Sequence, residues 1–176
     1  MQLIRLHLPF SLLSLLSLLS LLLFSPPAFS FTALVVSIKD GDTIEVLYNG
    51  RPTRIRLHGI DCPEKRQPYG YRAKIATAVL TFGQAVTIHS HEKDKYGRLV
   101  ADVILPDETN VNRLLVKDGW CWWYRKYAPA DTVLETLETE ARQTKRGLWI
   151  DPNPVPPWVY RKSKHKHAVG ISEHMP

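Results

Sequence analysis

The sequence contains little cysteine: Cys62 and Cys121 are the two cysteines among its 176 residues. Two thiols this far apart do not make a metal site, because a structural zinc ion needs closely spaced ligand pairs. In an exported protein the two could instead form a disulfide. The sequence leaves that bridge open, since it gives no distance between the two backbones.

Acidic residues are fewer than basic residues, with 17 Asp and Glu against 23 Lys and Arg. Without residues 1–30 the chain keeps 22 basic and 17 acidic residues, a net charge of +5. An exported basic domain favours a polyanionic partner, although the same charge would also serve plain solubility.

The long hydrophobic run stands at the N-terminus. Residues 1–30 combine one arginine, a leucine and serine run, and a small-x-small end at Ala28–Ser30. This pattern predicts a secretory signal peptide cleaved after Ser30, and so an extracellular or periplasmic protein. The alternative is an uncleaved anchor that would tether the chain to the envelope, because residues 8–24 are near the lower limit for spanning a bilayer.

Residues 31–150 show no internal repeat and no alternation of strand, helix and strand, which argues against a doubly wound parallel sheet. Residues 43–57 alternate around the turn dipeptide Asn49–Gly50 and predict a hairpin. Helical spacing indicates three helices: one over 70–82, one from an Asn110 cap to 119, and one from an Asp131 cap to 147. In the first of these, Ala73, Ile75, Ala76, Val79 and Leu80 have helical spacing. We expect one α+β, mainly β domain: a small closed barrel of five strands with about three packed helices.

Residues 151–176 change in character. Four prolines lie in DPNPVPPW, and the charge run RKSKHKH follows shortly after. We expect an extended, proline-stiffened strap that ends in a loose basic tail.

Charged residues gather where the predicted strands begin or end. Asp42 has the same parity as the apolar residues of its strand, so it lies at the rim of the core, while Arg56 has the opposite parity to Ile55 and Leu57 and can face Asp61. The complete set is Asp40, Asp42, Arg56, Asp61, Glu64, Asp94 and Arg98. If these carboxylates converge they repel each other, and a hard divalent cation such as Ca²⁺ would relieve the repulsion.

Two arginines beside a metal and carboxylate cluster then need an anion of their own. Phosphate suits the guanidinium fork, which donates two parallel hydrogen bonds. Such groups would stabilise a phosphoryl transition state. Glu64, held apart from Asp61 by Pro63, is our candidate for orienting or deprotonating the attacking water.

The motifs IKDGDTIEV, RIRLHGIDCPE and DKYGRLVADV occur in that order and are followed by VNRLLVKDGW. Over roughly residues 33–150 the sequence therefore resembles the thermonuclease (staphylococcal nuclease) family. The resemblance implies an OB-fold barrel, one Ca²⁺ and hydrolysis of phosphodiester bonds in DNA and RNA, with little sequence specificity and 3′-phosphate products.

The resemblance also assigns roles to individual residues. Asp42, Asp61 and the main-chain carbonyl of Cys62 would hold Ca²⁺, with Asp40 in an outer position. Arg56 and Arg98 would grip the scissile phosphate and Glu64 would act on the water. Substrate contacts would come from Lys95, Tyr96, Tyr124 and Tyr127.

Several alternatives remain. A non-catalytic OB-fold module that binds nucleic acid is the main rival, because barrels of this type also bind single strands without cutting them. His89 and His91 could bind a metal, but a solvated strand edge is the preferred interpretation, and His58 is interpreted as structural. No stable protein partner is implied and a monomer is expected. The sequence does not distinguish DNA from RNA as the physiological substrate.

Overall fold

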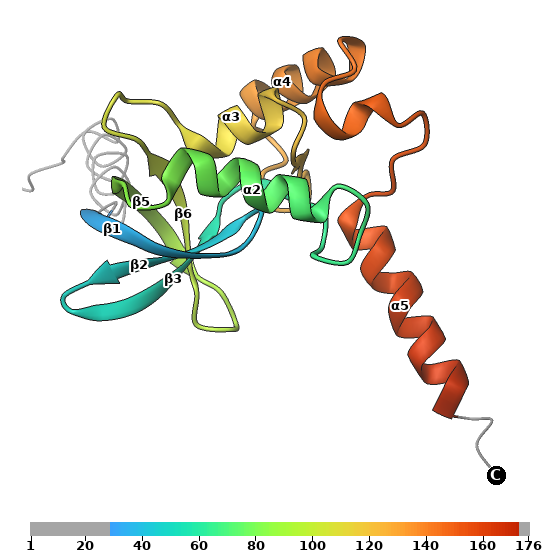
Figure 1. Cartoon of the computed structure of the whole chain (residues 1–176), viewed down its shortest axis with the longest axis horizontal. Coiled ribbons are helices and arrows are strands. Elements are labelled where there is room, and N and C mark those ends of the chain that lie inside the picture. Colours follow the sequence, from blue (N-terminus) through green and yellow to red (C-terminus); the bar gives the residue numbers. More distant parts are fainter. Residues whose placement is uncertain (1–28, 173–176) are drawn as a thin grey trace, which may run out of the picture.

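A closed five-stranded barrel forms the centre of the molecule in the computed structural model, which describes residues 29–172 (Figure 1). The strands follow the order β1-β2-β3-β6-β5, and β3 pairs in parallel with β6 while the other neighbours are antiparallel. Their bounds are β1 (Phe29–Asp40), β2 (Thr43–Tyr48), β3 (Arg51–Leu57), β5 (Ala85–Lys93) and β6 (Leu99–Ile104). This confirms the predicted fold class and the OB-type barrel.

The hairpin of β2 and β3 follows from its sequence. Asn49 and Gly50 have φ angles of 49° and 71°, and two successive positive φ values are what a type I′ turn requires. Alternation then directs Ile44, Val46 and Ile55 into the barrel, where all three are fully buried. The prediction for residues 43–57 is confirmed.

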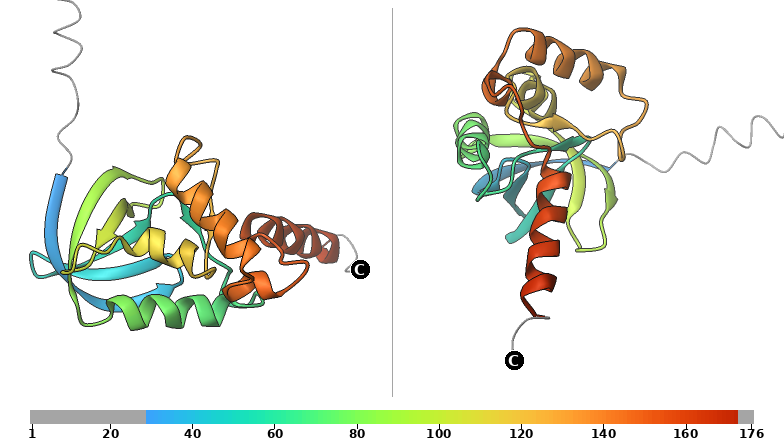
Figure 2. Two further views of the ribbon diagram at one scale, coloured as in Figure 1. Left: turned by 90° about the horizontal axis from the view of Figure 1, so that it is seen from above. Right: turned by 90° about the vertical axis from the view of Figure 1, so that its right-hand side faces the viewer.

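Three helices pack beside the barrel, as Figure 2 shows from two sides. They are α2 (Gly70–Thr81), α3 (Val111–Lys117) and α4 (Thr132–Gln143), and the short 3₁₀ helix η1 (Gly147–Ile150) follows α4. Both predicted caps are present: Asn110 accepts a hydrogen bond from Arg113 N, and Asp131 accepts one from Leu134 N.

The predicted helix over 70–82 is present, but its apolar residues at helical spacing do not all lie on its buried face. Ile75 and Val79 are 44% and 79% exposed, whereas Ala73 and Thr77 are buried. The reason is a close backbone approach: the Thr77 hydroxyl donates to the Gly41 carbonyl at 2.6 Å, so that face of α2 must be small.

A second, two-stranded sheet joins β4 (Ile60–Asp61) and β7 (Trp122–Trp123). In the aromatic segment 120–124, the two residues of β7 are the ones that pair. A disulfide links Cys62 and Cys121, whose Cα atoms are 4.1 Å apart, and so fixes the end of β4 to the segment before β7.

The C-terminal segment corrects the expectation of a strap with a loose tail. Residues 151–156 are irregular, but α5 (Pro157–Ser172) is a helix that extends from the body of the molecule (Figure 2). Proline suits the first helical position because its φ is already helical and its missing N–H has no partner there. The Pro156 carbonyl accepts hydrogen bonds from the backbone N–H groups of Val159 and Tyr160, which starts the helix.

Hydrophobic packing is divided between two clusters. The large core joins the barrel strands to residues of α2, α3 and α4, and a smaller cluster surrounds Trp122, Ala141, Leu148 and Trp149. In the described part of the chain no helix has the length and apolar character that a membrane crossing needs. The predicted signal peptide falls almost wholly on residues 1–28, outside the described residues, and its cleavage stays a prediction.

Candidate active site

The residues proposed for the site all line a single pocket of about 700 Å³. It lies where the ends of β1, β3 and β4 meet the β5–β6 turn and the loop after β7. Its lining includes Asp40, Asp42, Arg56, Asp61, Cys62, Glu64, Lys95, Tyr96, Arg98, Tyr124 and Tyr127. Residues as distant in sequence as 40 and 127 are thus brought together, while their individual roles stay predictions.

Backbone contacts fix the acidic end of this pocket. The Cys62 N–H donates to Asp42 Oδ2 at 2.8 Å, and the Leu57 N–H donates to the Asp42 carbonyl at 2.9 Å. Gly41 permits the approach, because a Cβ there would lie 2.7 Å from the Cys62 Cβ. The turn after β1 is therefore held against the end of β4.

Arg56 bridges the two acids proposed as metal ligands. Its Nη1 lies 2.9 Å from Asp42 Oδ2, and its Nη2 lies 3.1 Å from Asp61 Oδ1. Asp42, in the turn after β1, and Asp61, in β4, thus face the same guanidinium. The convergence expected from strand parity is present.

Burial and the charge of neighbouring Asp42 oppose ionisation of Asp40 and Asp61. Asp61 is 1% exposed, and burial raises its pKa, although a hydrogen bond from Arg161 opposes the shift. Burial, followed by the charge of neighbouring Asp42, raises the pKa of Asp40 to about 7. A bound cation would relieve both effects.

The donor chemistry of this end fits a hard ion. Asp40, Asp42 and Asp61 offer carboxylate oxygens, and the backbone near Cys62 adds a carbonyl, which are the oxygen donors that Ca²⁺ takes. The cysteine sulfur is not available, because it is bonded to Cys121.

Arg98 also lines the pocket, in the turn between β5 and β6. Its Nε and Nη2 lie 2.7 and 2.6 Å from Asp94 Oδ2, and Asp94 Oδ1 accepts hydrogen bonds from the backbone N–H groups of Tyr96 and Arg98. Asp94 therefore orients Arg98. The Tyr96 ring lies 5.4 Å from the Arg98 guanidinium carbon and 5.1 Å from Lys95 Nζ.

Tyr124 and Tyr127 stand in the loop after β7, with ring centroids 4.9 Å apart. Tyr127 is 58% exposed, so its ring is free to contact a ligand. Tyr124 is instead stacked on Trp158 of α5, with 5.3 Å between centroids and an interplanar angle of 2°.

Sequence reasoning missed Arg161, which also lines the pocket. Its Nη1 and Nη2 lie 2.7 Å from Glu64 Oε1 and Asp61 Oδ2, respectively. In the sequence, Arg161 begins the charge run RKSKHKH, which predicts a loose tail. The aromatic residues Trp158 and Tyr160 were the available signal that this segment packs against the domain.

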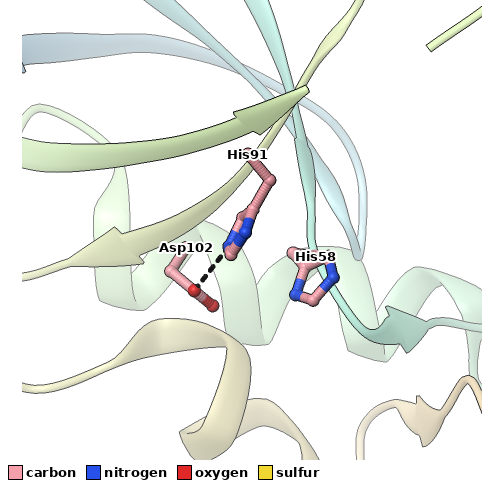
Figure 3. Close-up of side chains that lie close together, drawn as sticks. All are labelled: His58, His91 and Asp102. Carbon is pink, nitrogen blue, oxygen red and sulfur yellow. Dashed lines mark hydrogen bonds and ion pairs between the residues drawn. The ribbon is translucent and has the colours of Figure 1, made fainter. Parts of the chain in front are cut away.

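His58, which lines the pocket, forms a cluster with His91 and Asp102 (Figure 3). His91 Nε2 lies 2.8 Å from Asp102 Oδ2, and the His58 and His91 rings stack with 4.1 Å between centroids. Burial and then the neighbouring His91 lower the pKa of His58. The possible ligand atoms lie within 4.8 Å of one another, but stacked rings present faces rather than lone pairs, so sharing an ion would require rotation.

Comparison with known proteins agrees with this geometry. Residues 54–151 match the family model described as staphylococcal nuclease homologue. An uncharacterized endonuclease of Escherichia coli O157:H7 is 47% identical over 130 residues, which cover 74% of this chain and 84% of that protein. A micrococcal nuclease of Shigella flexneri is 42% identical over 152 residues, 81% of this chain and 87% of that protein. The chain belongs to the staphylococcal nuclease family.

Proposed function

We propose that the protein is an exported, Ca²⁺-dependent nuclease that hydrolyses phosphodiester bonds in DNA and RNA with little sequence preference and leaves 3′-phosphate ends. Family membership and relatives named as nucleases support the enzyme class, a hydrolytic endonuclease acting on nucleic acid. The observation that carries the proposal is the convergence of Asp42 and Asp61 on Arg56, in a pocket that Glu64 and Arg98 also line.

The acidic end would hold the ion through Asp42, Asp61 and the Cys62 carbonyl, with Asp40 outside the direct ligands. When bound, Ca²⁺ would supply positive charge to the phosphate oxygens as they gain charge. Arg56 is 15% exposed and already sits between both acids, so it is positioned to donate to a phosphate beside them.

Arg98 would donate to the same phosphate from the turn between β5 and β6. Asp94 holds its guanidinium through Nε and Nη2, and no contact of Nη1 with this acid is present among the described residues. An arginine oriented by an acid in this way loses little freedom when it binds a phosphate.

Glu64 would accept the proton of the attacking water. Its side chain is 40% exposed, so water can reach it. Lys95 and Tyr96 would contact a terminal phosphate, and the exposed ring of Tyr127, with Tyr124 beside it, would contact a base or sugar. Nothing in the pocket suggests a reader of base edges, which is why we propose little sequence preference.

Incubation with plasmid DNA and with RNA tests the proposal, in Ca²⁺ or in chelator, with the chemistry of the product ends determined. Wild-type protein should cleave both polymers in Ca²⁺ alone, and Glu64→Gln should lose most of that cleavage. Glu140→Gln, an exposed substitution on α4, is the matched control. Binding of an intact substrate after long incubation would favour the non-catalytic module instead.

A further inference from the structure

The Arg161 guanidinium lies at the acidic end of the pocket, where a metal ion would bind. Its Nη2 lies 2.7 Å from Asp61 Oδ2 and its Nη1 lies 3.2 Å from Asp61 Oδ1, which makes a two-pronged contact with one carboxylate. The same Nη1 lies 2.7 Å from Glu64 Oε1. One guanidinium therefore binds both the acid proposed to hold the metal and the acid proposed to act on water.

This contact belongs to a packed helix end. Trp158 stacks on Tyr124 and also meets Trp122 edge-on, with 5.6 Å between centroids. The Tyr160 hydroxyl donates to the Arg66 carbonyl at 3.0 Å. These anchors come directly before Arg161 in the sequence, so α5 delivers its guanidinium to the pocket in a fixed position.

The linker before α5 is fastened as well. Gln67 Nε2 donates to the Val155 carbonyl at 2.6 Å, and Gln67 Oε1 accepts from the Glu64 N–H at 3.1 Å. The segment that carries Glu64 and the segment that leads to α5 are thus connected through one side chain. A movement of the first turn of α5 would therefore also displace the segment that carries Glu64.

Arg161 and a metal ion compete for the same oxygens. Both oxygens of Asp61 already accept from guanidinium groups, Oδ1 from Arg56 and both from Arg161. Calcium binds carboxylate oxygens at about 2.3–2.6 Å. An ion at that distance from Asp61 Oδ2 would lie close to the Arg161 guanidinium, and two cations so close together repel each other.

We propose that Arg161 is a built-in counter-ion of the metal-binding carboxylates, which must leave Asp61 when the divalent ion binds and so lowers the affinity of the site for that ion. This inference rests on the proposed function, because it takes Asp61 as a metal ligand. Arg161 then acts on the reaction indirectly, through Asp61, by setting the concentration of divalent ion at which the site fills. Without the ion, it also keeps Asp61 and Glu64 neutralised.

Calorimetric titration of the purified full chain with Ca²⁺ tests the inference. Arg161→Ala should bind Ca²⁺ about tenfold more tightly than wild type, as expected when a charge-assisted contact with one half-exposed partner is removed. Arg161→Lys keeps the charge but loses the fork, and should fall between the two. Lys162→Ala makes the same change in net charge from an exposed position and should leave the affinity within about twofold.

The sign of the change decides the question. Unchanged or weaker Ca²⁺ binding by Arg161→Ala, with a circular dichroism spectrum like that of wild type, would overturn the inference and indicate a purely structural contact. Trp158→Ala gives an independent check, since loosening the helix anchor should also tighten Ca²⁺ binding, and an unchanged affinity would count against the inference. A wild-type protein that binds Ca²⁺ but cleaves no nucleic acid would refute the proposed function, and the affinity comparison would still judge Arg161.

Discussion

The disulfide between Cys62 and Cys121 should contribute a large share of the stability of the domain. It joins residues 59 positions apart. In the chain-entropy account, closing a loop of that length lowers the entropy of the unfolded chain by about 14 cal/mol/K, or about 4 kcal/mol at 25 °C. For a chain of this size, such a loss lowers Tm by roughly 10 °C.

The bridge also supports the acidic end of the pocket. Cys62 follows Asp61 directly, and its N–H donates to Asp42 Oδ2 at 2.8 Å. Without the covalent link to Cys121, the end of β4 is less constrained, and so is the position of Asp61. The reduced protein should therefore bind Ca²⁺ more weakly as well as unfold at a lower temperature.

Thermal unfolding followed by circular dichroism, with and without reductant, measures the effect. The Cys62→Ala, Cys121→Ala double variant should unfold at about the Tm of the reduced wild type and should not respond to reductant. Alkylation of free thiols before and after reduction establishes whether the bridge is present. A Tm that changes by less than about 2 °C, in protein whose bridge has been shown to open, would refute the reasoning.

Three further predictions concern charged residues near the pocket. Arg98→Ala should slow cleavage of plasmid by about a hundredfold or more, because it removes a phosphate donor, and a rate within threefold of wild type would exclude that role. Arg56→Ala should lower the free energy of unfolding by roughly 3 kcal/mol in urea without Ca²⁺, since Asp42 and Asp61 lose the cation between them, and a change below 1 kcal/mol would contradict this. The fold lowers the pKa of His58. Below about pH 6.5 this imidazole therefore binds a proton more readily in the unfolded chain than in the folded chain. Wild type should therefore lose stability relative to His58→Gln as pH falls from 7 to 5, and parallel stability curves would show that burial of this imidazole has no such effect.

The barrel and the convergence of the acids could be predicted because both depend on local rules. Alternation and the Asn49–Gly50 turn define the hairpin, and parity then places Asp42 at the rim and Arg56 toward Asp61. The resemblance to a family of nucleases extended this to Lys95, Tyr96, Tyr124 and Tyr127, which also line the pocket.

The features that sequence reasoning missed depend on contacts between distant segments. Ile75 and Val79 have helical spacing, but the close approach of Gly41 selects the small face of α2 instead. The bridge from Cys62 stayed open because spacing along the chain does not give a distance. Arg161 was overlooked because its meaning comes from the docking of α5, which no periodicity in the tail indicated.

Calorimetric titration with Ca²⁺ of wild type and of Asp61→Asn, with Asp107→Asn as an exposed control outside the pocket, tests the central claim most directly. We expect wild type and Asp107→Asn to bind the ion alike, and Asp61→Asn to bind it at least about tenfold more weakly because a carboxylate ligand is lost. Equal Ca²⁺ affinity in all three proteins would contradict the assignment of Asp61 to a metal site, and with it the account of how this pocket acts on a phosphodiester.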